Sequence, residues 1–187
     1  GGVVGRLLSI PVIWHCRVGT ADPWLDCLLL RLADRIVANS RATASRFPLS
    51  FQDKVTVIYN GFDLEWLGDS GVAKPVLIEE GWKTILVVAR ASRWKRHDLI
   101  LEAFEAIAQA EQSAHLICVG ARDPSEPSWW DKLQEKTGRS PFASRIHWIG
   151  AVDDVRPWYR AASLLVLPST NEPFGRVVVE AMASGLP

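Results

Sequence analysis

Short apolar runs alternate with amphipathic segments along most of the chain. The runs are rich in branched side chains, which is typical of strands in a parallel sheet. They predict strands at 11–14, 35–40, 54–59, 84–89, 115–120, 145–150 and 163–168. Helical periodicity lies between them, at 24–33, 41–47, 97–110, 128–136 and 154–162. Strands that alternate with helices predict an α/β fold with doubly wound parallel sheets and right-handed crossovers.

The pattern of apolar residues also predicts how three of these segments are buried. The apolar run at 24–33 is broken only by Asp26 and Arg31, so we expect a mostly buried helix. The run at 163–168 is short and unbroken, which predicts a strand buried on both faces. The helix at 97–110 should bury one stripe, made of Leu99, Ile100, Ala103, Phe104 and Ile107.

Periodicity is lost between Phe62 and Trp82, in a segment with several glycines and Pro75. Such a change is typical of a domain boundary, which we place near residues 60–80. The chain then divides into a first domain at 1–62, a linker at 63–82 and a second domain at 83–187.

Composition and charge narrow the function. Lys and Arg together number 21, as do Asp and Glu, and no long run of either sign occurs, which argues against nucleic-acid binding. The three cysteines form no C-x-x-C pair, and an odd count is typical of a reducing compartment, so we place the protein in the cytoplasm. No apolar segment has the length of about 20 residues that a membrane-spanning helix needs. A peripheral contact with the inner membrane face stays open.

The last stretch of the chain, 168–187, predicts a loop and a helix after the final strand. Pro173 can occupy the first helical position, and Gly185 is a typical stop signal. Glu172 would then lie at the mouth of the helix and Glu180 about two turns inside. A strand, a tight turn and a helix with free first amides form an anion site at the carboxyl edge of a sheet.

Other polar groups are expected at the same edge. Arg90 and Lys95 follow the fourth predicted strand, and a turn follows Ile149. Two cations beside a helix N-terminus favour a group with about two negative charges, such as a diphosphate. Glu180, about 10 Å along the helix, could hold ribose hydroxyls, and Glu172 the hydroxyls of a second ring. A nucleotide sugar has this layout.

Each of these residues also has an ordinary interpretation. His15 ends the first predicted strand, where either a ligand contact or a structural hydrogen bond fits. Arg90, Lys95, Glu172 and Glu180, taken singly, fit solvated surface charges. Their order along the chain is what favours a site.

The same residues carry a resemblance to a known family. Glu172 and Glu180 are separated by seven residues within PSTNEPFGRVVVEAMASGLP. This stretch resembles the E-x7-E signature of the retaining GT-B glycosyltransferases of family GT4. VAR at 88–90 with Lys95 resembles the phosphate clamp of that family, although Arg96 replaces a frequent glycine.

Two further segments extend the resemblance over nearly the whole chain. VIYNGFD at 57–63 is similar to the interdomain V-I-P-N-G-V-D of the family, with Tyr59 in place of the proline. RIVANS at 35–40 resembles its first-domain V-x-A-x-S strand.

The resemblance implies two Rossmann-like domains with the active site between them. Residues 1–62 would be the C-terminal part of the first, acceptor-side domain, and 83–187 the second, donor domain, truncated at its end. The implied reaction moves a sugar from a nucleotide diphosphate sugar to a hydroxyl of a glycan, lipid or small-molecule acceptor. It would retain the anomeric configuration and need neither a metal nor a cofactor.

The resemblance also implies a role for each site residue. The catalytic residues would be Glu172 and His15. The donor diphosphate would be bound by Arg90, Lys95, Gly175, Arg176 and Val177, and the donor sugar by Glu172, Phe174 and Gly175. The ribose and base would be bound by Glu180, Ile149, Gly150 and Val152.

By the same resemblance, we expect the chain to be an internal fragment of a longer enzyme, and whether it is active alone stays open. A Gly-rich loop and early strands would precede Gly1, and a strand and a crossing helix would follow Pro187. Two alternatives also stay open, a non-catalytic nucleotide-sugar-binding module and a GT-B-like epimerase or phosphorylase.

Overall fold

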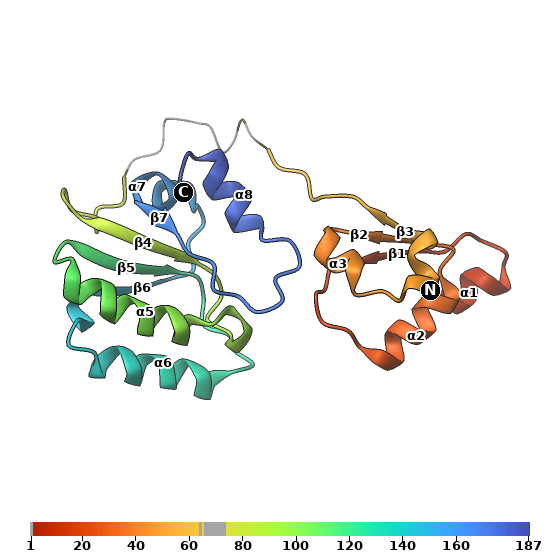
Figure 1. Cartoon of the computed structure of the whole chain (residues 1–187), viewed down its shortest axis with the longest axis horizontal. Coiled ribbons are helices and arrows are strands. Elements are labelled where there is room, and N and C mark those ends of the chain that lie inside the picture. Colours follow the sequence, from red (N-terminus) through yellow and green to blue (C-terminus); the bar gives the residue numbers. More distant parts are fainter. Residues whose placement is uncertain (1, 64, 66–73) are drawn as a thin grey trace. The chain divides into compact units, whose positions relative to one another are not determined.

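The computed structural model describes residues 2–63, 65 and 74–187. The chain forms two compact units, each with its own parallel sheet (Figure 1). One unit comprises Gly1–Gly61 and Asn171–Gly175, and the other comprises Phe62–Thr170 and Arg176–Pro187. The predicted linker at 63–82 lies partly outside the described residues.

The first unit contains a sheet in the order β1-β2-β3, with all pairings parallel. Its strands are β1 (Ile13–Cys16), β2 (Arg35–Ala38) and β3 (Val55–Val57). Its helices are α1 (Gly2–Leu7), α2 (Pro23–Leu32) and α3 (Arg41–Ser45), with the 3-10 helix η1 (Leu49–Lys54). The core of this unit is formed by Cys16, Leu30, Ala33, Ile36 and Phe47.

α3 begins where the sequence predicts and α2 begins one residue earlier, but α1 was not predicted, and α2 is not buried as predicted. The Ser40 hydroxyl accepts a hydrogen bond from the Thr43 amide and caps α3, and Asp22 caps α2 in the same way. The prediction that α2 is mostly buried is wrong, because Trp24 is 90% exposed and Leu30 alone among the residues of this helix is fully buried. A helix against one face of a sheet buries a single stripe, so its other apolar side chains face solvent.

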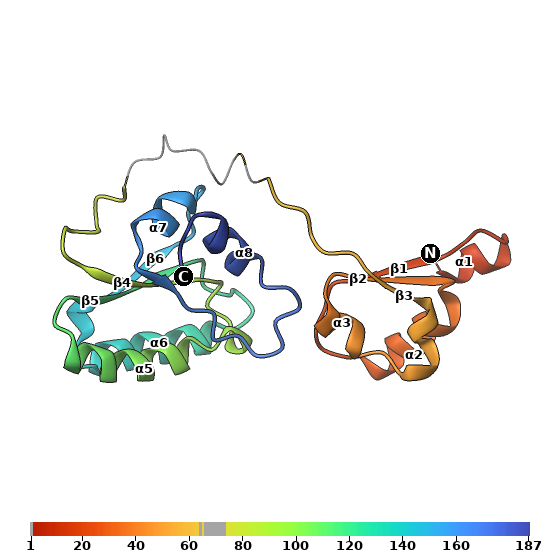
Figure 2. The same ribbon diagram turned by 45° about the horizontal axis from the view of Figure 1, so that its top comes forward.

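The second unit contains a sheet in the order β6-β5-β4-β7, again with all pairings parallel. Its strands are β4 (Lys83–Val88), β5 (Ala114–Val119), β6 (Ile146–Gly150) and β7 (Leu164–Leu165). Its helices are α5 (His97–Ala110), α6 (Pro127–Arg139), α7 (Arg156–Ala161) and α8 (Arg176–Ala183), with the 3-10 turns η2 (Arg93–Lys95) and η3 (Ala143–Arg145). Figures 1 and 2 show α5 and α6 on one face of the sheet and α7 and α8 on the other, which confirms the doubly wound arrangement.

Alternate residues of the central strands pack on opposite faces, as the strand period of two requires. Ile85 and Val87 belong to the cluster formed with α5 and α6. Leu86 and Ile117 belong to the cluster formed with α7 and α8. Both faces of β4 and β5 are therefore covered by apolar side chains.

α5 has the predicted bounds, but its buried stripe differs from the prediction. Leu99, Ala103 and Ile107 are exposed. The buried residues are His97, Ile100, Leu101, Phe104 and Ala108. The sequence pattern favours the wrong stripe because it counts His97 as polar, whereas this imidazole packs against the ring of Trp148.

The prediction that the strand at 163–168 is buried on both faces is also wrong. β7 contains two residues, Leu164 and Leu165, which pair with Ile85 and Leu86. β7 is the edge strand of the described sheet, so it has one neighbour, and Leu164 is exposed. An apolar run does not by itself distinguish an edge strand from a central one.

α8 begins later than predicted. Its first residue is Arg176 rather than Pro173, because Gly175 takes a left-handed conformation with a φ of 76° that interrupts the helix. Glu172 consequently lies in the loop before the helix. Glu180 is about one turn inside α8, or about 6 Å from its start, and not two turns.

The end of α8 is as predicted. Gly185 has a φ of 75°, and its amide donates to the Met182 carbonyl at 3.0 Å. The Leu186 amide donates to the Ala181 carbonyl at 2.9 Å. This pair of hydrogen bonds around a left-handed glycine satisfies the last carbonyls of a helix. No helix in the described part of the chain combines the length and the apolar character needed to span a bilayer.

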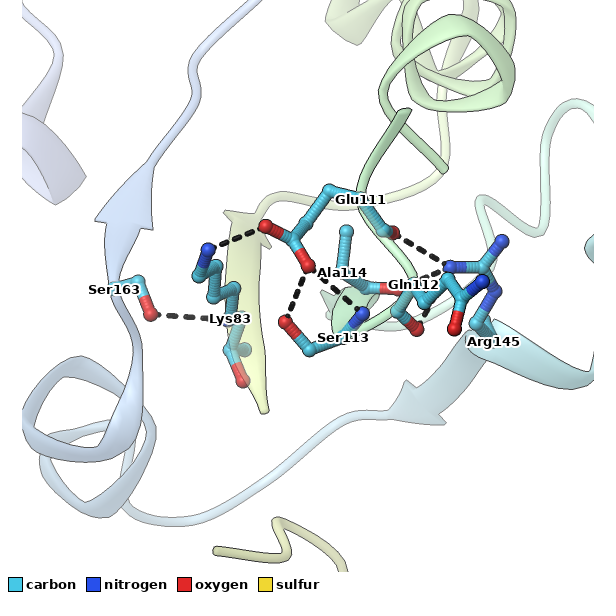
Figure 3. A network of polar contacts seen from close by, with 8 residues as sticks. Lys83, Glu111, Gln112, Ser113, Ala114, Arg145 and Ser163 are labelled. Atoms are coloured by element: carbon cyan, nitrogen blue, oxygen red, sulfur yellow. Dashed lines mark hydrogen bonds and ion pairs between the residues drawn. The ribbon is translucent and has the colours of Figure 1, made fainter. Parts of the chain in front are cut away.

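A polar network joins the end of α5 to the start of β5 and β6 (Figure 3). The Arg145 guanidinium donates to four backbone carbonyls at 2.6–3.4 Å, those of Ala108, Glu111, Gln112 and Ala114. Carbonyls at a helix end need such external donors. The Glu111 carboxylate pairs with Lys83 and accepts from Ser113, and these hydrogen bonds lower the pKa of Glu111 to about 2. The amino ends of the strands are therefore held by charged groups.

Candidate functional site

The carboxyl edge of the second sheet opens into a cavity of about 480 Å³. The strand order reverses beside β4, so the cavity lies at the switch point where α/β sheets bind ligands. Its size is that of a small-molecule site. Its lining includes Ala89, Arg90, Trp94, Lys95, Gly120, Val152, Val155 and Val177.

Gly120 allows the ends of three strands to approach one another. Its φ is 144°, and a Cβ at this position would lie 2.1 Å from the carbonyl oxygen of Ala89. Its amide donates to the carbonyl of Gly150 at 2.7 Å. The absence of a side chain here therefore shapes the floor of the cavity.

Arg90 brings one positive charge to the cavity. Its guanidinium lies 3.6 Å from the Asp123 carboxylate, and its side chain is 64% exposed. Asp123 also accepts from the hydroxyl and the amide of Ser125, and these hydrogen bonds, with a smaller contribution from Arg90, hold the pKa of Asp123 below its usual range. The guanidinium is exposed, and 3.6 Å is longer than a good charged hydrogen bond, so the pair is weak. The guanidinium is thus oriented, yet it can exchange Asp123 for a more highly charged anion.

Lys95 brings a second positive charge. Its Nζ lies 3.8 Å from the centroid of the Trp94 ring, within cation–π distance. The carbonyl of Trp94 accepts a hydrogen bond from the Thr170 amide at 2.7 Å, which ties η2 to the segment after β7. The aromatic ring therefore supports the ammonium at the wall of the cavity.

The backbone conformation of Arg96 is one that favours glycine, the residue that is frequent at this position in the family that the sequence resembles. Its φ is 53°, in the left-handed region that glycine adopts most easily. The guanidinium donates to both oxygens of Asp98, from Nε at 3.1 Å and from Nη2 at 3.3 Å. This pairing raises the pKa of Arg96. The ion pair closes the turn that presents Lys95.

His97 follows this turn and is fully buried. Burial, and then the charge of Lys95, lower the pKa of His97 to about 4. Neither ring nitrogen has a hydrogen-bond partner among the described residues. The imidazole is therefore neutral at pH 7 and adds no charge to the site.

Glu180 lies on α8 with its side chain 14% exposed. One carboxylate oxygen accepts a hydrogen bond from the Tyr159 hydroxyl at 2.8 Å, and the other lies 3.5 Å from the Arg176 guanidinium. The carboxylate is thus oriented by groups from two helices.

The structure brings together part of the predicted site. Arg90, Lys95, Val152 and Val177 line one cavity. Arg176 and Glu180 lie on the helix that contributes Val177. Ile149 and Gly150 are the last residues of β6. The Gly150 carbonyl already accepts a hydrogen bond from the Gly120 amide.

Four predicted residues belong to the other unit. Glu172, Phe174 and Gly175 are in the segment Asn171–Gly175, which groups with the first unit. His15 lies in β1, one residue before its end and not after it, and is exposed. The roles assigned to these four residues stay predictions.

Sequence reasoning missed three residues of this region. A glycine directly after a strand, as Gly120 is, signals close backbone approach and could have been noticed. Trp94 adjoins Lys95 and could have been paired with it. Tyr159 carries no local signal, because its partner Glu180 is 21 residues away.

Curated relatives match most of the chain. It is 36% identical to the mannosylfructose-phosphate synthase of Agrobacterium fabrum over 110 residues, which are 56% of this chain and 24% of that protein. It is 32% identical to D-inositol 3-phosphate glycosyltransferase 2 of Catenulispora acidiphila over 170 residues, which are 83% of this chain and 39% of that protein. The chain spans less than half the length of these relatives.

A solved structure covers the whole chain. The crystal structure of Anabaena Alr3699/HepE in complex with UDP and glucose has a TM-score of 0.83 and 25% identity, covering 100% of this chain and 54% of that one. This likeness confirms the predicted α/β fold of the GT-B class.

The model of one protein family matches residues 82–187, which include every residue that lines the cavity. The family is described as glycosyl transferases group 1. The match extends over more than half of the chain, and the relatives and the fold agree with it. The chain therefore belongs to the glycosyl transferases group 1 family.

Proposed function

We propose that the full-length protein transfers a sugar from a nucleotide diphosphate sugar to an acceptor hydroxyl with retention of configuration. The observation that carries this proposal is the cavity at the switch point, where Arg90 and Lys95 lie beside a residue of the first turn of α8, Val177. Support for the donor comes from the Anabaena protein, whose structures include complexes with UDP and with UDP-glucose.

In this proposal the donor diphosphate occupies the cavity. Arg90 would exchange Asp123 for phosphate oxygens, which a guanidinium can bind through two hydrogen bonds. Lys95 would add a second charge, and the first amides of α8, those of Arg176 and Val177, would face the anion. These groups could neutralise the leaving diphosphate, so the proposal requires no divalent metal.

The remaining roles follow the resemblance to the family. Glu180 would bind the ribose, and the backbone at Ile149, Gly150 and Val152 the base. Glu172, Phe174 and Gly175 would bind the donor sugar, with Glu172 and His15 as the catalytic residues. Retention rests on the family alone, and we nominate no carboxylate as a nucleophile.

The acceptor side and the compartment are also part of the proposal. The acceptor would be a hydroxyl of a glycan, a lipid or a small molecule. Cys16, Cys27 and Cys118 are free thiols, which supports a reducing compartment such as the cytoplasm. Burial raises the pKa of the Cys118 thiol, so it is unreactive.

A thermal-shift screen of the full-length protein tests the proposal. A bound donor raises the melting temperature by mass action, so one of the UDP-, GDP- or ADP-sugars should stabilise the protein. The donor so identified should then support sugar transfer, and product analysis by NMR gives the anomeric configuration. The absence of a shift with all three classes of donor would overturn the proposal.

Removing Arg90 should weaken nucleotide binding selectively. In Arg90→Ala we expect about tenfold lower affinity for the nucleoside diphosphate in calorimetry, the loss of a charged hydrogen bond. The matched control is Arg93→Ala, which removes an equal charge three residues away. Arg93 stacks on Trp129 at 5.0 Å and does not line the cavity. Equal losses in the two variants would contradict a direct role for Arg90.

A further inference from the structure

Tyr159 is a buried phenol whose hydroxyl faces a residue of the proposed site. It lies on α7 with 1% of its surface exposed, among apolar side chains that include Leu86 and Ile117. Its hydroxyl donates to the Glu180 carboxylate on α8 at 2.8 Å. This hydrogen bond links two helices that cover the same face of the sheet (Figures 1 and 2).

The protonation state of the Tyr159 phenol is determined by burial. Burial, and then the hydrogen bond to Glu180, raise the pKa of Tyr159, so the phenol stays protonated and acts as a donor at any physiological pH. A carboxylate with little exposure to water needs donors in place of its lost hydration. The Tyr159 hydroxyl is one such donor.

The pair lies next to the cavity. Val155 and Val177 both line it. Tyr159 is four residues after Val155, and its amide donates to the Val155 carbonyl at 3.2 Å. Glu180 is three residues after Val177 on α8. Because residues three or four apart share a helix face, Tyr159 and Glu180 each lie one turn beyond a cavity wall.

The remaining acceptor capacity of Glu180 suits a diol. A carboxylate offers about four lone-pair positions. Tyr159 takes one, and Arg176 approaches the other oxygen at 3.5 Å from a side chain that is 59% exposed. A separation of 3.5 Å is longer than a good charged hydrogen bond and the guanidinium itself is exposed, so Arg176 can leave for a phosphate. One fixed donor then remains, and at least two positions stay available for two neighbouring hydroxyls.

We propose that Tyr159 is a positioning residue, which holds the Glu180 carboxylate in the orientation that accepts hydrogen bonds from the 2′ and 3′ hydroxyls of a nucleotide ribose. This inference rests on the proposed function, because it requires that a nucleoside diphosphate binds in the cavity. Tyr159 does not touch the ribose in this proposal. It acts through Glu180.

The test compares two probes in the full-length protein by calorimetry, UDP and 2′,3′-dideoxy-UDP, with ADP and GDP pairs in parallel. In Tyr159→Phe we expect about tenfold lower affinity for the ribose nucleotide. Affinity for the dideoxy analogue should be unchanged, because the lost contact acts only on the two hydroxyls. An equal loss for both probes would reduce Tyr159 to a purely structural role and overturn the inference.

The chain offers a matched control, because Tyr59 is the only other tyrosine in the sequence. Tyr59→Phe makes the same chemical change at an exposed ring and should bind both probes as the wild type does. Glu180→Ala separates the role of Tyr159 from nucleotide binding itself. If it lowers affinity for UDP while Tyr159→Phe does not, the inference fails and the proposed function stands. If the wild type binds no nucleoside diphosphate, the proposed function itself is wrong.

A second measurement keeps the inference testable if Tyr159→Phe folds poorly. Labelling tyrosine with 13C at Cζ gives two NMR signals in residues 1–187, and Tyr59→Phe assigns them. Binding of UDP should shift the Tyr159 signal, because its hydrogen-bond partner gains new donors, whereas the dideoxy analogue should leave it in place. A signal that responds to neither probe, or equally to both, overturns the proposal.

Discussion

Arg96 and His97 adjoin in the chain but are constrained in different ways. The backbone of Arg96 is left-handed, a conformation that a side chain with a Cβ disfavours, and its ion pair with Asp98 offsets this. His97 is enclosed without a hydrogen bond and kept neutral by burial. Both residues flank the turn that carries Lys95. Neither the ion pair of Arg96 with Asp98 nor the packing of His97 against Trp148 can be predicted from composition or periodicity.

Acidification should destabilise the second unit through His97. The unfolded imidazole takes up a proton below its ordinary pKa of 6.5, whereas burial keeps the folded pKa at about 4. The stabilisation is therefore complete above pH 6.5 and is lost as the pH falls toward 4. Between about pH 7 and pH 5 the free energy of unfolding should drop by about 2 kcal/mol, which urea unfolding at the two pH values measures.

His97→Phe provides the control for this prediction. It keeps an aromatic ring against Trp148 but cannot titrate. Its stability should therefore vary less with pH than that of the wild type. The pKa values of His115 and His147 are also lowered by burial, so these two residues should still make the stability of His97→Phe depend on pH. Identical pH dependence in both proteins would assign the effect to other groups.

At the scale of elements, the pattern of apolar residues predicts a helix or strand whose periodicity is local. It does not predict features that depend on residues far away in the sequence. α5 has its predicted bounds because its periodicity spans 14 residues. The start of α8 depends on the left-handed Gly175, and the exposure of β7 depends on its place at the edge. In the site, the positions of Arg90 and Lys95 after a strand were predictable. The Tyr159 contact to Glu180 was not, because it joins two helices.

The close approach of the ends of β4 and β5 at Gly120 can be tested by replacing this glycine and, as a control, Gly138. Gly120→Ala places a Cβ 2.1 Å from the Ala89 carbonyl oxygen and should cost about 2–4 kcal/mol of stability, with a loss of nucleotide affinity as the cavity floor shifts. Gly138→Ala meets no atom within 4 Å and lies in α6, so it should stabilise by about 0.5–1 kcal/mol. Thermal unfolding and calorimetry check both. A neutral Gly120→Ala would contradict the close approach.

At the scale of the whole molecule, the chain has separate cores in its two units. One cluster surrounds Ile36 in the first unit, and two clusters cover the faces of the second sheet. The family model covers the second unit from residue 82, which also holds the cavity. Nucleotide binding and the integrity of the first core should therefore be separable properties.

Ile36→Ala tests this separation. Ile36 is fully buried, so the variant should lose about 2–5 kcal/mol in the first unit. In hydrogen exchange followed by mass spectrometry, the amides of β1 to β3 should exchange faster, while those of β4 to β6 keep their protection. Ile117→Ala, in the second sheet, should give the reverse pattern. Uniform acceleration in both variants would show a single cooperative unit.

The left-handed turn at Arg96 has a consequence for how this chain can vary. Asp98 compensates the backbone conformation of Arg96 through both of its carboxylate oxygens. Replacing Asp98 by alanine should therefore cost more stability while Arg96 is present than once Arg96 has been replaced by glycine, where only the backbone hydrogen bonds that Asp98 accepts at the start of α5 are lost. The left-handed backbone at Arg96 thus makes the cost of a substitution at position 98 depend on the residue at position 96.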